Sequence, residues 1–287
     1  MNPVVILAFD GGLEAAAIPA LACQRSVDVV TLTVDIGQSR DARALRDIAL
    51  AAGAIRAHVV DAVDDFVRHC VLPALQSSPG IAPVWNSSTR LAYPVIAARL
   101  VQAAHREQAR LVAHGGGEEL TAAIHDIDPS LEVIVVEPAP RSSRPDVTIA
   151  RHLLQRPVAD PAVARGVPAN VEIEFDAAVP VAINGVSLAP AELIESLSLI
   201  GGQHGIGHAE SADAPGALVL EAAYRALDCE SGVVRIELLD GRQRVLSADP
   251  ADLLPSRSAA ERYAAGEAGG RTRSALRRSE PTLVNHA

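Results

Sequence analysis

The chain of 287 residues contains no lysine, because all 25 of its basic side chains are arginines. Its 35 acidic residues give a formal net charge of −10. An acidic chain without a basic stripe is not typical of a nucleic-acid-binding protein. The missing lysine also excludes any mechanism that needs a lysine amine. We therefore expect no nucleic-acid partner.

Aromatic residues, cysteines and long apolar runs are also scarce. Aromatics make up 2% of the chain and apolar residues 49%, so the core must be built from Ala, Val, Leu and Ile. The three cysteines form no Cys-x-x-Cys pair, which disfavours a disulfide framework or structural zinc and predicts buried, inert thiols. No apolar run reaches the ~18 residues of a membrane span. Met1-Asn2-Pro3 carries no basic leader. We expect a cytoplasmic protein without membrane contact.

The first apolar run is the most informative stretch of the chain. Residues 4–9 are followed by Asp10, Gly11 and Gly12 and then by an alanine-rich stretch. This order predicts a buried strand, a tight turn and a helix N-terminus. Glycines let the backbone approach a ligand closely, and the free N–H groups at a helix start attract anions. The stretch therefore predicts a phosphate cradle.

The same stretch resembles the pyrophosphate-binding loop of the N-type ATP pyrophosphatases, which reads Ser-Gly-Gly-x-Asp followed by Ser or Thr. In this chain Asp10 stands at the serine position, Glu14 at the aspartate position, and Ala15 and Ala16 at the hydroxyl positions. A carboxylate at Asp10 would face the phosphates, and two like charges a few ångströms apart repel by about a few kcal/mol. The cradle is kept while its side chains have changed.

Strand and helix patterns alternate through the first half of the chain. This alternation predicts right-handed βαβ units, a parallel sheet covered on both faces, and ligands at the carboxyl ends of the strands. Further strands are expected over 27–34, 55–60, 111–114 and 132–136. Helices are expected in the stretch that ends at residue 25 and over 40–52, 61–75 and 89–108. A proline- and glycine-rich loop is expected over 76–88. Residues 115–119 are interpreted as an acidic glycine loop.

A proline-bracketed break at 138–145 predicts a domain boundary. Beyond it we expect helices over 148–155, 190–200, 217–227 and 257–265. Two hairpins are expected, formed by 171–175 with 179–183 and by 233–239 with 243–246. Turns are expected at Asn184-Gly185 and Asp240-Gly241, and a glycine turn over 201–207. The predicted architecture is an α/β domain over 1–140, a reduced α+β domain over 146–265 and a flexible tail over 266–287.

Several segments together resemble argininosuccinate synthase, a family of the ATP-pyrophosphatase fold. They are Val-Asp-Ile-Gly-Gln at 34–38, Leu-Pro-Ala-Leu-Gln at 72–76, Tyr93-Pro94, Val-Ala-His-Gly at 112–115, Val-Glu-Ile-Glu-Phe at 171–175, Val-Pro-Val-Ala-Ile-Asn-Gly at 179–185 and His-Gly-Ile-Gly at 204–207. The resemblance implies a ligase that joins citrulline to aspartate and converts ATP to AMP and pyrophosphate. Such an enzyme acts mainly by positioning and charge stabilisation.

The substrate side departs from the family pattern. The family's Thr-Gly-Lys-Gly-Asn-Asp-Gln segment after the His-Gly is replaced by Gly116 to Leu120, in a loop several residues shorter. The tyrosine and arginine that flank the family's citrulline loop align with Trp85 and Tyr93, while Thr89 fits its expected position. Where the family has a C-terminal arm used in oligomer contacts, we expect residues 271–287 to stand in its place.

The resemblance and the residues together give a candidate site. Candidate catalytic residues are Asp10, Glu14 and His114; candidate nucleotide-binding residues are Ala8, Gly11, Gly12, Val34, Asp35 and Gly115; candidate substrate-binding residues are Trp85, Thr89, Tyr93 and Glu118. Asp10, Glu14, Glu118 and Glu119 could recruit Mg²⁺ or act as acid and base, or could be solvated loop acids. His114 is interpreted either as a base or as a structural histidine at a strand end.

Two functions follow from this site. One is an ATP-dependent C–N ligase that acts on a different, amino-acid-like substrate in specialised biosynthesis, with ATP and Mg²⁺ as cofactors. The other is a homologue without adenylating activity that serves as a binding or partner subunit, or that uses the pocket without ATP. A homo-oligomer or a partner protein is possible in both cases.

Overall fold

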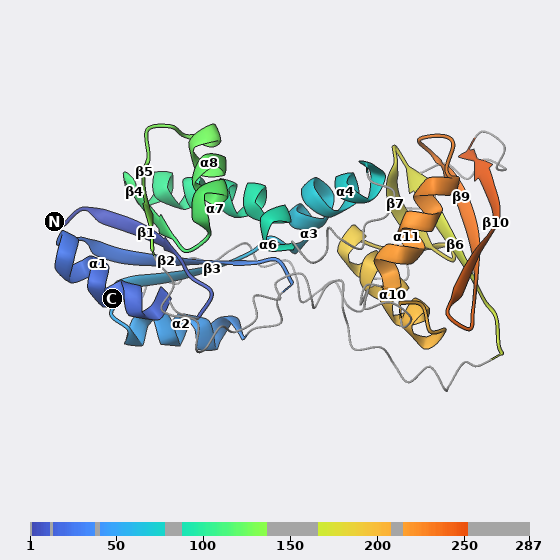
Figure 1. Cartoon of the computed structure of the whole chain (residues 1–287), viewed down its shortest axis with the longest axis horizontal. Coiled ribbons are helices and arrows are strands. Elements are labelled where there is room, and N and C mark those ends of the chain that lie inside the picture. The colour runs from blue at the N-terminus through green and yellow to red at the C-terminus, as the bar shows by residue number, and fades with distance from the viewer. Residues whose placement is uncertain are drawn as a thin grey trace.

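A computed structural model describes residues 2–11, 14–37, 41–77, 88–136, 166–207 and 215–251. The chain forms two lobes, each built on its own five-stranded sheet, with the helices α3 and α4 between them (Figure 1). No helix among the described residues is long and apolar enough to cross a membrane. The two sheets and the helices packed on them confirm the predicted α/β architecture with a second α+β domain.

The first sheet is parallel and has the strand order β3-β2-β1-β4-β5. All four predicted strands after β1 are present. The strands are β1 (Val4–Ala8), β2 (Asp28–Asp35), β3 (Arg56–Asp61), β4 (Leu111–His114) and β5 (Glu132–Val135). Because β1 is central, the turn that follows it lies between the turns that follow β2 and β4.

Helices cover both faces of this sheet. Ile18 of α1 (Glu14–Arg25) and Leu45 of α2 (Ala42–Ala51) pack with Val5 and Leu7 on one face. Helices α7 (Tyr93–Arg106) and α8 (Gly117–Ile127) cover the other face. The sequence predicted α1, α2 and α7, with α7 preceded by the short helix α6 (Ser88–Leu91). It did not predict α8.

The interpretation of 115–119 as an acidic loop is therefore wrong for its second half. Helix α8 begins at Gly117, so Glu118 and Glu119 lie in its first turn. Acidic side chains are favourable there because the N-terminal end of a helix carries partial positive charge. Leu120 and Ile124, four residues apart, bury the inner face of α8.

The predicted helix over 61–75 is present in three consecutive parts. These are α3 (Val63–Phe66), a π-helical turn η1 (Val67–Val71) and α4 (Leu72–Ser77). Their apolar face, which includes Phe66, Val71 and Leu75, packs into one core with the second sheet and its helices. The two lobes therefore share a hydrophobic core.

The second sheet is antiparallel and has the order β10-β9-β6-β7-β8. Both predicted hairpins are present. The elements are β6 (Ala169–Asp176), β7 (Val179–Ile183), β8 (Val186–Ser187), α10 (Pro190–Gln203), α11 (Pro215–Ala226), β9 (Gly232–Leu239) and β10 (Arg242–Pro250). Helix α10 continues through Gly201 and Gly202, so the glycine turn expected over 201–207 starts later than predicted.

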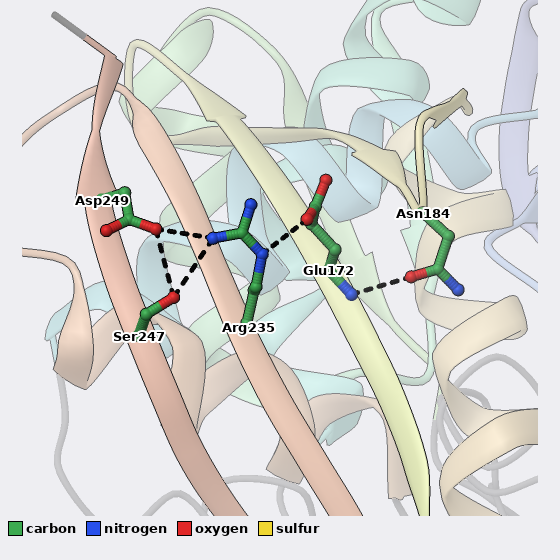
Figure 2. Close-up of polar contacts among 5 residues, drawn as sticks. All are labelled: Glu172, Asn184, Arg235, Ser247 and Asp249. Atoms are coloured by element: carbon green, nitrogen blue, oxygen red, sulfur yellow. Dashed lines mark hydrogen bonds and ion pairs between the residues drawn. The ribbon is translucent and has the colours of Figure 1, made fainter. Parts of the chain in front are cut away.

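The two faces of the second sheet differ in polarity. Alternate side chains such as Ile173 and Ile236 are fully buried in the core with α10 and α11. On the opposite face, Arg235 of β9 bonds Glu172 of β6 (2.7 Å) and Asp249 of β10 (2.6 Å), so one guanidinium ties three strands together (Figure 2). The pKa of Arg235 is raised chiefly by its hydrogen bond to Glu172.

The remaining predictions on organisation fall partly outside the described residues. These are the loop over 78–87, the break at 138–145, the helices over 148–155 and 257–265, and the tail over 266–287. The prediction of buried cysteines holds for Cys70, where burial raises the thiol pKa to about 11. It is wrong for Cys23, which is exposed on α1, and Cys229 is partly exposed.

Candidate functional site

The turn after β1, predicted to be a phosphate cradle, is described up to Gly11 and again from Glu14. The N–H of Phe9 still pairs with the carbonyl of Leu32 at 2.9 Å, and the chain leaves the sheet at Asp10, which is partly buried. Gly11 has a φ of +83°, in the region that glycine adopts without strain. Helix α1 then begins at Glu14. Gly12 and the side chain of Glu14 lie outside the described residues.

The turn after β2 lies next to this one. The Oδ1 atom of Asp35 accepts a hydrogen bond from the N–H of Gly37 at 2.9 Å, and Gly37 has a φ of +99°. The carbonyl of Asp35 accepts a second bond from Ala62 at 2.7 Å. Ile36 is fully buried in the core that joins the two lobes. Asp35 therefore closes its own turn with its carboxylate, and this turn is anchored at its base.

His114 ends β4, and hydrogen bonds engage both of its ring nitrogens. Nδ1 accepts from the N–H of Gly116 at 3.1 Å, which leaves the proton on Nε2, where it is donated to Oγ1 of Thr121 at 3.1 Å. The hydroxyl of Thr121 in turn donates to the carbonyl of Gly117 at 3.3 Å. The ring is completely buried, and this burial lowers its pKa to about 4. His114 is therefore neutral and fixes the start of α8, which favours the structural interpretation over a catalytic base.

Gly116 is held by side chains at both of its backbone polar groups. Its N–H bonds His114, and its carbonyl accepts a hydrogen bond of 2.8 Å from the hydroxyl of Tyr93, at the start of α7. A Cβ atom at Gly116 would lie 2.7 Å from Cδ2 of Leu120, so a larger residue would displace that buried side chain. The starts of α7 and α8 are thus held together through one glycine.

An ion pair spans the same junction. Arg90 of α6 contacts Glu119 of α8 with 2.7 Å between Nη1 and Oε1. Burial raises the pKa of Tyr93, and the negative charge of Glu119 raises it further, while Arg90 opposes this effect. Tyr93 is therefore protonated at neutral pH and donates its bond to Gly116. Glu118, the neighbour of Glu119, is exposed.

The sheet brings most of the described candidate residues to one edge. Parallel pairing of Leu7 with Ala113 and of Ala8 with Leu32 aligns the ends of β1, β2 and β4. Ala8, Asp10, Gly11, Val34, Asp35, His114 and Gly115 therefore follow or end adjacent strands, and Tyr93 and Glu118 lie at the adjoining helix starts. Thr89 lies in α6, although its side chain, like all of Trp85, is outside the described residues.

Sequence reasoning missed two residues of this site. Thr121 gives a weak signal, because it lies seven residues after His114 and four after Gly117, one helical turn into α8. Arg90 gives none, because its partner is 29 positions away in the sequence. Both acquire their roles only once α8 is recognised as a helix.

A carboxylate cluster for Mg²⁺, one of the alternatives that the sequence left open for the acidic candidate residues, is not found among the described residues. They contain no group of three or more His, Cys, Asp or Glu side chains arranged to hold a metal ion. Glu119 is engaged with Arg90 and Asp35 with its own turn. The donor set of the described part of the chain therefore does not fit a resident Mg²⁺ ion.

Known proteins match both lobes. The family model described as the arginosuccinate synthase N-terminal HUP domain matches residues 4–151, and the model of the C-terminal domain matches residues 147–240. Argininosuccinate synthase of Streptococcus suis is 29% identical over 282 residues, which cover 78% of this chain and 71% of that protein.

Two further relatives carry the same name. Argininosuccinate synthase of Synechococcus elongatus is 33% identical and aligns with 71% of this chain, and that of Streptococcus gordonii is 30% identical and aligns with 78%. The chain spans 62% of the first of these relatives and 70% of the second. The expected family is confirmed by both domain models and by these relatives. The chain belongs to the argininosuccinate synthase family.

Proposed function

We propose that this chain is an ATP-dependent, AMP-forming C–N ligase whose substrate differs from that of its relatives. The observation that carries the proposal is the pair of turns after β1 and β2, where Gly11 and Gly37 adopt positive φ beside each other at the end of a parallel sheet. Ligands of such sheets bind at the carboxyl ends of the strands. The family relationship supports ATP as that ligand.

Main-chain groups would carry nucleotide binding. Ala8, Gly11 and Gly12 would line the phosphates, and Val34 and Asp35 would hold the adenosine, with Gly115 closing the edge. These contacts need backbone N–H and C=O groups rather than special side chains, so the loss of the hydroxyls at Ala15 and Ala16 still leaves them available. Asp10 would face the phosphates with its own negative charge. Magnesium would therefore arrive bound to ATP, where it offsets that repulsion.

The substrate side supports a change of specificity. The family segment with a lysine is replaced by Gly116 and the first turn of α8, so Glu118 and Glu119 stand where the family has a lysine. The hydroxyl of Tyr93 is committed to Gly116. We propose that Trp85, Thr89, Tyr93 and Glu118 line a site for a small amino-acid-like molecule, with Asp10 or Glu14 as acid or base. A homo-oligomer or a partner protein would complete the assembly.

A second function is favoured by one specific observation. The described segments 2–11, 35–37 and 115–119, at the ends of β1, β2 and β4, contain acidic residues but no arginine. A site that adenylates its substrate must offset the charge of a triphosphate. If no metal or partner supplies that charge, the chain is a binding or partner subunit without adenylating activity.

Product analysis separates these two functions. The purified chain is incubated with Mg-ATP and with pairs of a ureido or carboxylate compound and an amine, and AMP and pyrophosphate are measured. Substrate-dependent formation of both products in equal amounts supports the ligase. No consumption of ATP with any pair while ATP is bound would leave the binding-subunit function instead, and formation of ADP would contradict both functions.

A further inference from the structure

The ion pair between Arg90 and Glu119 is open to solvent. The side chain of Arg90 is 68% exposed and that of Glu119 is 53% exposed, although Nη1 and Oε1 are 2.7 Å apart. Exposed pairs of this kind contribute little to stability, because water screens the charges and two long side chains lose freedom. Another oxyanion can therefore replace Glu119 on Arg90 at little cost to the fold.

Arg90 brings a positive charge to an edge that otherwise carries negative charge. The turns after β1, β2 and β4 contribute Asp10, Asp35, Glu118 and Glu119 and no basic residue among the described segments 2–11, 35–37 and 115–119. The planar guanidinium of Arg90 can donate hydrogen bonds to two oxygens of a carboxylate or phosphate at once. Glu119 of the same chain supplies such a carboxylate to Arg90.

The position of Arg90 is set by the scaffold rather than by this pair. Arg90 lies in α6, just before α7, and the first residue of α7, Tyr93, is bonded to Gly116 at 2.8 Å. Gly116 is bonded in turn to the buried His114. Loss of Glu119 therefore removes a competitor for Arg90 without removing the contacts that hold α7 against α8.

We propose that Arg90 binds an oxyanion of the substrate, and that Glu119 occupies the same guanidinium until the substrate arrives. The oxyanion is a carboxylate, an identity that rests on the amino-acid-like substrate of the proposed function. Glu119 then competes with the substrate for Arg90 within the same chain. This competition lowers the apparent affinity of the chain for any anion that must displace Glu119.

Isothermal titration of three forms of the full chain tests this. The parent, Glu119→Gln and Arg90→Gln are titrated with L-citrulline and with L-aspartate, and with N-carbamoylputrescine, which is citrulline without its carboxylate. We expect Glu119→Gln to bind a carboxylate probe roughly threefold to tenfold more tightly than the parent, and Arg90→Gln to bind it about tenfold more weakly. N-carbamoylputrescine should not distinguish the three forms.

The matched control is Glu132→Gln, which removes one charge from another exposed pair, with Arg25, at the start of β5. It should bind the probes as the parent does, and thermal unfolding confirms that all variants are folded. Equal affinity of the parent and Glu119→Gln for both carboxylates, or binding by neither, would overturn the proposal. Pyrophosphate is titrated as a fourth probe, and if Glu119→Gln bound pyrophosphate but neither carboxylate more tightly than the parent, Arg90 would be assigned to phosphate and the carboxylate assignment overturned.

ATP titration of the same variants separates this proposal from the proposed function. A gain in carboxylate affinity in Glu119→Gln without any binding of ATP would retain Arg90 as an anion site and reject the ligase. Binding of ATP by all forms with no difference in carboxylate affinity would reject Arg90 and retain the ligase.

Discussion

At the scale of single residues, His114 shows how burial decides between two roles. The ring accepts from Gly116 and donates to Thr121, so proton transfer to Nδ1 would require the bond to Gly116 to break. Sequence alone left both roles open, because a histidine at the end of a strand next to a glycine loop suits either. The described contacts make it a positioning residue for α8.

This assignment predicts how stability depends on pH. The pKa of His114 falls from 6.5 in the unfolded chain to about 4 in the folded one. Above pH 6.5 the ring is neutral in both states, and its contribution is complete. As the pH falls from 6.5 towards 4, only the unfolded chain gains the proton, so the folded state loses roughly 3 kcal/mol.

The matched variant is His114→Asn, whose side-chain oxygen can still accept from Gly116 but does not titrate in this range. Urea unfolding of both forms from pH 7.5 to 4 should show the parent losing stability more steeply as the pH falls. A difference between the two free energies of unfolding that stays constant across this range would contradict the assignment.

At the scale of elements, two of the three hairpin turns of the second sheet reach positive φ with different residues. Asn184 and Gly185 form one turn with φ of +50° and +76°, as the sequence predicted. Ala177 and Ala178 form the turn between β6 and β7 with φ of +47° and +59°, which is unfavourable for alanine. Gln76 and Tyr224 both donate to the carbonyl of Ala178, at 2.9 and 3.0 Å. Contacts with α4 and α11 therefore impose the strained turn.

Relief of this strain should stabilise the chain. The double variant Ala177→Asn, Ala178→Gly places the favoured pair in the turn, and we expect its free energy of unfolding to rise by about 1 kcal/mol. Gly185→Ala is the reverse control, since a Cβ atom there meets nothing within 4 Å and its cost, also about 1 kcal/mol, comes from the backbone. Thermal unfolding measures both. A double variant less stable than the parent would show that Ala178 makes packing contacts worth more than the strain.

Most elements of the first lobe could be predicted, because alternating strands and helices leave a clear pattern in a chain rich in Val, Leu and Ala. Helix α8 could not be predicted from the same pattern, because three glycines and two glutamates suggest a loop. Its start is fixed by the bond from Tyr93 to the carbonyl of Gly116, which joins segments that are distant in the sequence, and by two local bonds, from Gly116 to His114 and from Thr121 to Gly117. The contact between Arg90 and Glu119 was hidden for the same reason.

At the scale of the whole molecule, α3 and α4 lie between the two lobes (Figure 1), and the hydrophobic core that these helices share with the second sheet couples the lobes. Phe66, Val67 and Val71 come from the helices that follow β3, yet they pack with Ile173 and Ile236 of the second sheet. The turn that holds Asp35 is anchored in this core through Ile36. Stability of the second lobe therefore supports the geometry of the candidate nucleotide site in the first.

Truncation of Phe66 tests this coupling. Phe66 is fully buried, so Phe66→Ala should cost about 3 to 5 kcal/mol. Hydrogen exchange should accelerate in β9 and α10 as well as in α3 and α4. Ile18→Ala, in the separate core under α1, is the control and should act mainly on β1 and α1. Unchanged exchange in β9 on truncation of Phe66 would mean that the lobes unfold independently.

On the proposed function, the turns after β1 and β2 bind ATP despite Asp10. The decisive measurement is a titration of the purified chain with ATP, with and without Mg²⁺, in which the double variant Asp10→Ser, Glu14→Asp is titrated alongside. We expect ATP to bind in the presence of Mg²⁺, and the variant to bind about tenfold or more tightly because a carboxylate no longer faces the phosphates. No binding of ATP by either form, with or without Mg²⁺, would contradict the account.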